Sequence, residues 1–180
     1  MELIDALDHS FQHAEGVIAQ VRVDQYDNRT PCDKWSVREL LEHTIGVVAG
    51  LGAAASSTPG AAFELGTDPA AQFRDAAKTT LEAWRAPGVL DRVVDAGPGP
   101  MPGRVLAGIN LLDTTTHTWD IASATGQPTK LPDDVAATAL EVSHSIVTPQ
   151  LRDGRFGPEV PVAADADATD RLVAFLGRHP

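Results

Sequence analysis

The sequence contains one cysteine, few aromatic residues and too few basic residues to balance its acidic ones. The single cysteine, Cys32, excludes an internal disulfide and any zinc site built from several cysteines. With 14 lysines and arginines against 25 aspartates and glutamates, the formal net charge is −11. This charge argues against a protein that binds nucleic acid or an anionic membrane surface, because both partners are recognised through clustered basic residues.

A basic leader and a long apolar run are also missing. The N-terminus carries Glu2 and Asp5 where a signal peptide would be basic. Residues 44–63 have no charged side chain, but small residues dominate them and Pro59-Gly60 interrupts them, so we expect no membrane span. With 43% apolar residues the chain can build a core. We therefore expect one soluble, cytoplasmic domain over residues 1–180.

Apolar residues recur at helical spacing along most of the chain. Ser36 and Glu39 have the spacing of a capping box, and Asp68 followed by Pro69 is typical of a helix start. Residues 87–103 hold eight glycines or prolines, which predicts a loop or small hairpin. The helices are expected at residues 4–21, from 36 onward, 68–86, 103–124, 133–147 and 167–176. The pattern predicts an all-α fold, an up-and-down four-helix bundle with extra short helices and with this loop or small β-hairpin.

Three polar residues fall within the apolar stripe of the fourth expected helix. At 100° per residue, Asp113, His117 and Asp120 point to the same side as Leu106 and Ile109. In the same frame Val105, Leu112 and Thr116 complete the stripe. An unpaired buried carboxylate is costly, so these groups need a cation or a hydrogen-bond network. The pair Asp113-x3-His117 offers two ligand atoms on adjacent turns, as in helical bundles that hold divalent metals.

His43 lies at the edge of the buried face of the second expected helix. Together with Asp113 and His117 it would complete a set of two histidines and one carboxylate, which leaves a coordination position open. An alternative without metal also fits: His43 bonds to a backbone carbonyl and Asp113 pairs with an arginine. Helical spacing cannot distinguish these alternatives, because it does not show that two helices meet.

The remaining candidates are weaker on the same test. His9 and His13 are four residues apart but fall opposite the apolar seam, so we expect both to face water. His144 is also expected to point outward, and His179 lies at the end of the chain. Cys32 comes just before a helix start, where a thiolate could be stabilised, although a small buried hydrophobic residue beside Trp35 is the preferred interpretation. Motifs of serine hydrolases, phosphate loops and dinucleotide-binding folds are absent.

These residues resemble a known family. The segments Thr30-Pro31-Cys32-x-x-Trp35-x-Val37-x-x-Leu40-x-x-His43 and Asp113-x3-His117-x-Trp119-Asp120-Ile121-Ala122 are similar to the DinB/YfiT-like metalloenzyme superfamily. Within it, the chain most resembles the metal-binding domain of mycothiol-dependent maleylpyruvate isomerase. The ending, from Phe156-Gly157-Pro158 to Leu176-Gly177-Arg178, is also similar.

The resemblance implies a four-helix bundle that holds a divalent ion, with zinc expected and nickel or another divalent ion as alternatives. The implied ligands are His43, Asp113 and His117. Apart from the resemblance, Asp120 is the one further inward-facing residue that could serve as a ligand, and we expect it to support a ligand from behind instead. The resemblance also implies a low-molecular-weight thiol as cosubstrate. Two departures argue against isomerisation of maleylpyruvate itself. The isomerase has glutamate where this chain has Asp113, and residues 133–180 are too short to supply its additional catalytic domain.

Two functions remain open at this stage. The first is a thiol-dependent metalloenzyme of the transferase or isomerase type, whose partners are a small thiol and a small electrophile. The second is a metal-binding bundle without catalysis, in which the ion stabilises the fold or mediates an interaction. An enzyme needs an open coordination position, whereas a structural site closes with a fourth protein ligand. The residues rich in alanine and glycine after His43 leave a homodimer open as well.

Overall fold

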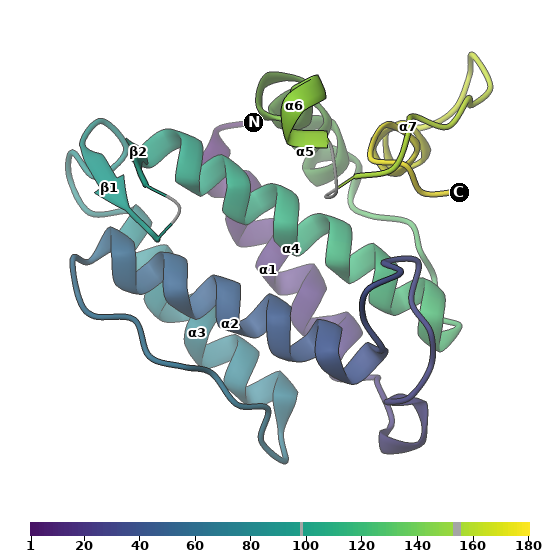
Figure 1. Ribbon diagram of the computed structural model, residues 1–180, viewed down its shortest axis with the longest axis horizontal. Helices are drawn as coiled ribbons and strands as arrows, with labels where there is room; N and C mark the ends of the chain where they lie inside the picture. The colour runs from purple at the N-terminus through teal and green to yellow at the C-terminus, as the bar shows by residue number, and fades with distance from the viewer. Residues whose placement is uncertain (98, 153–155) are drawn as a thin grey trace.

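Four long helices form the core of the computed structural model, which describes residues 1–97, 99–152 and 156–180. They are α1 (Leu3–Ile18), α2 (Val37–Ala55), α3 (Pro69–Trp84) and α4 (Gly103–Thr125) (Figure 1). Helices α1 and α2 each pack against both α3 and α4, so the four close into a bundle around one apolar core. The predicted all-α helical bundle is confirmed.

The helices do not alternate in direction, which corrects the expected up-and-down order. α1 and α4 run one way, and α2 and α3 run together the other way (Figure 1). In the second halves of α3 and α2, the Thr80 hydroxyl donates to the Val48 carbonyl at 2.8 Å. Arg92, beyond the end of α3, donates to the carbonyl of Ala55, the last residue of α2. The two C-terminal ends therefore lie together, as in parallel neighbours. Residues 56–68 therefore return along the length of the bundle. Apolar spacing could not predict this, because it reports the buried face of a helix and not its direction.

Capping interactions and a glycine mark three of the predicted helix ends. At the start of α2, the Glu39 carboxylate accepts a hydrogen bond from the Ser36 amide at 2.8 Å, and the Ser36 hydroxyl caps the Glu39 amide. Asp68 caps α3 by accepting from the Ala71 amide at 2.9 Å. Gly126, with a φ of 71°, ends α4 in a left-handed conformation that glycine adopts without strain.

Two expectations for helix faces and lengths were wrong. α1 ends at Ile18, and after a break the chain forms the short 3₁₀ helix η1 (Val23–Gln25). Val21 lies beyond the end of α1 but still packs against the core. The spacing from Ile18 to Val21 therefore predicted burial correctly, although the helix does not continue to Val21. Val105, expected in the apolar stripe of α4, is 37% exposed because it lies in the first turn, near the end of the bundle.

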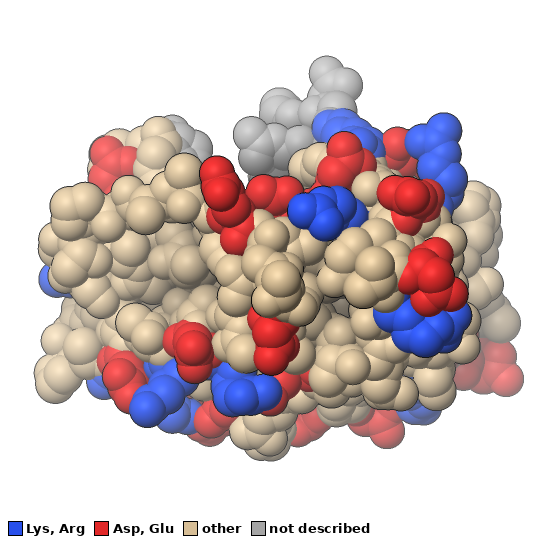
Figure 2. Space-filling view, turned by 90° about the horizontal axis from the view of Figure 1, so that it is seen from below, with Lys and Arg blue, Asp and Glu red and all other residues tan. Residues whose placement is uncertain are grey.

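The remaining elements surround this bundle. The predicted hairpin is present as β1 (Val93–Asp95) and β2 (Pro100–Pro102), which pair in antiparallel fashion. α5 (Asp133–Ile146) packs on α4 and α1, α7 (Ala168–Phe175) packs on α5, and the unexpected one-turn helix α6 (Pro149–Arg152) lies between them in the chain. Within the described ranges, no helix combines the length and apolar character needed to cross a bilayer. Acidic side chains are spread over the face in Figure 2, with basic ones between them.

Candidate metal site

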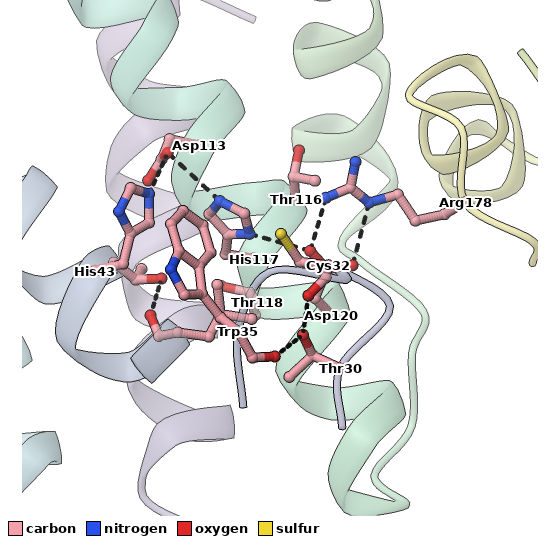
Figure 3. Close-up of polar contacts among 12 residues, drawn as sticks. Thr30, Cys32, Trp35, His43, Asp113, Thr116, His117, Thr118, Asp120 and Arg178 are labelled. Atoms are coloured by element: carbon pink, nitrogen blue, oxygen red, sulfur yellow. Dashed lines mark hydrogen bonds and ion pairs between the residues drawn. The ribbon is translucent and has the colours of Figure 1, made fainter. Parts of the chain in front are cut away.

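Helices α2 and α4 bring His43, Asp113 and His117 together. The Nε2 atom of His43 lies 3.2 Å from Oδ1 of Asp113, and the Nε2 atom of His117 lies 3.6 Å from the same oxygen (Figure 3). One potential ligand atom from each residue lies within 4.8 Å of the other two. The side chains are 29%, 18% and 10% exposed, respectively, so the cluster is sheltered yet reachable from solvent.

The second oxygen of Asp113 provides a test of whether a cation fits. Oδ2 of Asp113 is buried and has no hydrogen-bond partner among the residues that the structure describes. A buried carboxylate oxygen without a partner is unfavourable, and a bound cation would remove that cost. Two imidazole nitrogens and a carboxylate oxygen are ligands typical of Zn²⁺ and similar divalent ions. The residues present therefore fit such an ion.

The orientation of His117 is set from behind by Asp120. The Nδ1 atom of His117 lies 3.0 Å from Oδ2 of Asp120, which is fully buried. Burial raises the pKa of Asp120, but hydrogen bonds from His117 and Arg178 and the charge of Arg178 outweigh it, so the pKa lies below its ordinary value. A carboxylate oxygen accepts hydrogen bonds, so Nδ1 of His117 is the donor to Asp120, and Nε2, on the side of Asp113, is the atom available to a metal ion.

Arg178 completes this arrangement from the C-terminal segment. Its Nε donates to Oδ1 of Asp120 at 3.2 Å and its Nη2 donates to Oδ2 at 2.9 Å, a two-point contact visible in Figure 3. Arg178 is only 8% exposed. The arginine therefore compensates the buried charge of Asp120. Among the described residues, the ion-pair partners of Asp113 are His43 and His117, and no lysine or arginine pairs with it.

The segment before α2 covers one side of the cluster. The Trp35 ring stacks on His43 with centroids 4.2 Å apart, and it meets His117 edge-on at 5.8 Å. The Thr30 hydroxyl is 2.9 Å from the Cys32 carbonyl and 2.8 Å from the Trp35 carbonyl, which holds this turn in shape. The motif around Trp35 thus limits the orientations that the His43 ring can take.

Cys32 takes part in a second, overlapping cluster with His117 and Asp120. In that cluster both carboxylate oxygens of Asp120 and the Nδ1 atom of His117 already have partners. Burial and the negative charge of Asp120 raise the pKa of the Cys32 thiol. The activated-thiolate interpretation of Cys32 is therefore not supported, and the first cluster is the better cation site.

The other histidines lie away from the cluster. His9 is exposed and contacts Asp134 at 2.8 Å, whereas His13, expected to face water, is partly buried. His144 is exposed against the edge of the Phe175 ring, and His179 is exposed near the chain end. Sequence reasoning did not assign a role to Arg178. The signal was Asp120, since a carboxylate on a buried face needs a cation or a hydrogen-bond network, and an arginine elsewhere in the chain can supply either.

Comparison with known proteins shows the family to which this chain belongs. Residues 7–122 match the model of the mycothiol maleylpyruvate isomerase N-terminal domain. Two uncharacterized proteins from different strains of Mycobacterium tuberculosis are each 37% identical to this chain over 167 residues, which is 90% of this chain and 90% of each relative. No solved structure matches the chain. The chain therefore belongs to the mycothiol maleylpyruvate isomerase N-terminal domain family, part of the DinB/YfiT-like superfamily.

Proposed function

We propose that this protein is a divalent-metal enzyme that joins a low-molecular-weight thiol to a small electrophile, or uses that thiol to isomerise it. The observation that carries the proposal is the convergence of two imidazole Nε2 atoms on Asp113, whose second oxygen is buried without a partner. Zinc is the proposed ion, and a thiol of the mycothiol type is the proposed cosubstrate, in line with the family.

His43, Asp113 and His117 would hold the ion. One carboxylate among three ligands leaves a divalent ion with a net charge near +1. Such an ion supplies Lewis acidity and favours the thiolate form of a thiol at its open position. Asp120 and Arg178 would keep Nε2 of His117 turned toward the ion, and Trp35 would limit rotation of the His43 ring.

An open coordination position favours catalysis over a structural role. Within the described part of the chain, no fourth histidine, cysteine, aspartate or glutamate joins the set of His43, Asp113 and His117. Structural zinc sites are closed by four protein ligands, whereas catalytic sites keep a position for water or substrate. The partial exposure of His43 and Asp113 leaves an approach from solvent.

Addition of a thiol to a polarised carbon–carbon double bond fits these components. The sulfur lone pair forms a bond to the electron-poor carbon, and the proton lost from the thiol ends on the neighbouring carbon. No oxidant or reductant is required. The addition turns the double bond into a single bond, about which the molecule can rotate. If the thiol is then eliminated, the double bond re-forms in the other configuration and the thiol is released.

The cobalt-substituted protein provides the test. Titration with mycothiol should produce a sulfur-to-metal charge-transfer band, and proton release should accompany it near neutral pH. The matched control is the oxygen analogue of the thiol, which should give no such band. A spectrum that no tested thiol perturbs, together with a fourth protein ligand on the ion, would replace this proposal with the non-catalytic metal-binding bundle.

A further inference from the structure

A groove of about 650 Å³ runs along α2 beside the candidate metal site. Its walls come from α2, from the returning connection before α3 and from the turn after β1. His43 belongs both to this groove and to the metal cluster, so a molecule in the groove would lie next to the ion. The volume is in the range of small-molecule sites.

The wall of the groove is largely apolar. Val47 and Leu51 contribute from one face of α2, and Phe63 contributes from the connection opposite. Gly50 opens onto the groove, since a Cβ placed there would meet no atom within 4 Å. Cellular thiol cosubstrates are polar molecules. Burial of a hydrocarbon chain or ring against this apolar wall would be favourable, so the groove suits a different, more apolar molecule.

The charges on the groove have one sign. Glu42, the residue before His43, and Asp95, at the end of β1, are the charged residues among those that line it in the described part of the chain. The described lining includes no lysine or arginine that could bind a carboxylate or phosphate. The net charge of −11 adds to the repulsion of anions.

We propose that this groove binds the electrophilic cosubstrate. This cosubstrate has an apolar chain or ring, its overall charge is zero or positive, and it carries no anionic group. Its apolar part lies against Val47, Leu51 and Phe63, and its reactive carbon lies toward His43. The identification of the occupant as the electrophile rests on the proposed function. The selection against anions rests on the groove alone.

Three probes with the same chain and different heads test the proposal: hexylammonium, 1-hexanol and hexanoate. In NMR titrations of the full-length protein, the probes should shift the amide signals of Gly46 and Gly50, which line the groove. Hexylammonium should bind at least about tenfold more tightly than hexanoate, with hexanol between them. The double variant E42Q/D95N should reduce this preference to less than about threefold, because it removes the two carboxylates.

The second part of the test fills the groove with a side chain. Gly50→Leu should abolish binding of all three probes, and its metal content should stay unchanged. Gly16→Leu is the matched control, since Gly16 lies on α1 and a Cβ there also meets no atom within 4 Å. Equal or tighter binding of hexanoate, or unchanged binding in Gly50→Leu, would overturn the proposal. Probe binding without any effect of thiols on the cobalt spectrum would instead contradict the proposed function and leave the groove's selectivity standing.

Discussion

Arg178 and Asp120 form a buried two-point ion pair that ties the C-terminal segment to the C-terminal part of α4. The two contacts measure 3.2 and 2.9 Å, and Nη1 of Arg178 also donates to the Leu176 carbonyl at 3.0 Å. Because Asp120 in turn contacts His117, the docking of the chain end is coupled to the orientation of a candidate metal ligand. This coupling leads to the first three predictions.

Removal of Arg178 should destabilise the fold strongly. Arg178→Met leaves the carboxylate of Asp120 buried without its cation, which should lower the free energy of unfolding by about 3–5 kcal/mol. Arg178→Lys should recover part of the loss, since it keeps the charge but not the two-point geometry. Chemical denaturation measures the effect. The control is Arg171→Met, an exposed arginine that bonds the Ala164 carbonyl, and an equal effect of the two methionine variants would refute the prediction.

The Asp120 carboxylate should make the fold sensitive to acid. Its pKa is lower in the folded protein than in the unfolded chain, so the unfolded state binds the proton more readily. The stabilisation is fully present above the unfolded pKa of about 3.9 and is lost as the pH falls through the folded value. Between about pH 5 and pH 3, the free energy of unfolding should therefore fall more steeply in the wild type than in Asp120→Asn. Parallel curves for the two proteins would contradict this prediction.

Asp120 should also affect metal binding without touching the ion. In Asp120→Asn the side chain can still accept a hydrogen bond from His117 but no longer carries the charge that polarises the ring. Metal affinity should fall by about 10–100-fold, as measured by competition with a chromophoric chelator. Asp134→Asn provides the control, because Asp134 contacts the exposed His9 and should have no effect on affinity. If the two variants behave alike, Asp120 does not support the site.

The Cys32 thiol should react slowly. Burial and the neighbouring Asp120 raise the pKa of this thiol, so little thiolate forms near neutral pH. The pH profile of its alkylation by iodoacetamide should have its midpoint above that of the same residue in the urea-unfolded protein. A midpoint below that of the unfolded chain would identify Cys32 as an activated nucleophile.

The sequence predicted those parts of the molecule that depend on local chemistry. The helix starts at Ser36 and Asp68 follow from capping, and the shared face of Asp113 and His117 follows from a spacing of four residues. The meeting of His43 with Asp113 needed the resemblance to a family, because the two residues are 70 positions apart.

Other features depend on contacts that no local pattern records. Arg178 reaches Asp120 across 58 positions from a segment outside the bundle. The parallel direction of α2 and α3 depends on the path of residues 56–68, which have no regular structure of their own. His13 is partly buried although it lies opposite the apolar seam of α1, so the frame of a single helix did not predict its surroundings.

The most direct test of the central claim is the metal content of untagged, full-length protein and two single variants. His43→Ala removes a ligand of the proposed site only, whereas Cys32→Ser removes a member of the overlapping cluster only. Our account predicts close to one divalent ion per chain in the wild type and in Cys32→Ser, and little or none in His43→Ala. Full metal content in His43→Ala with loss in Cys32→Ser would contradict it and move the ion to the cluster of Cys32, His117 and Asp120.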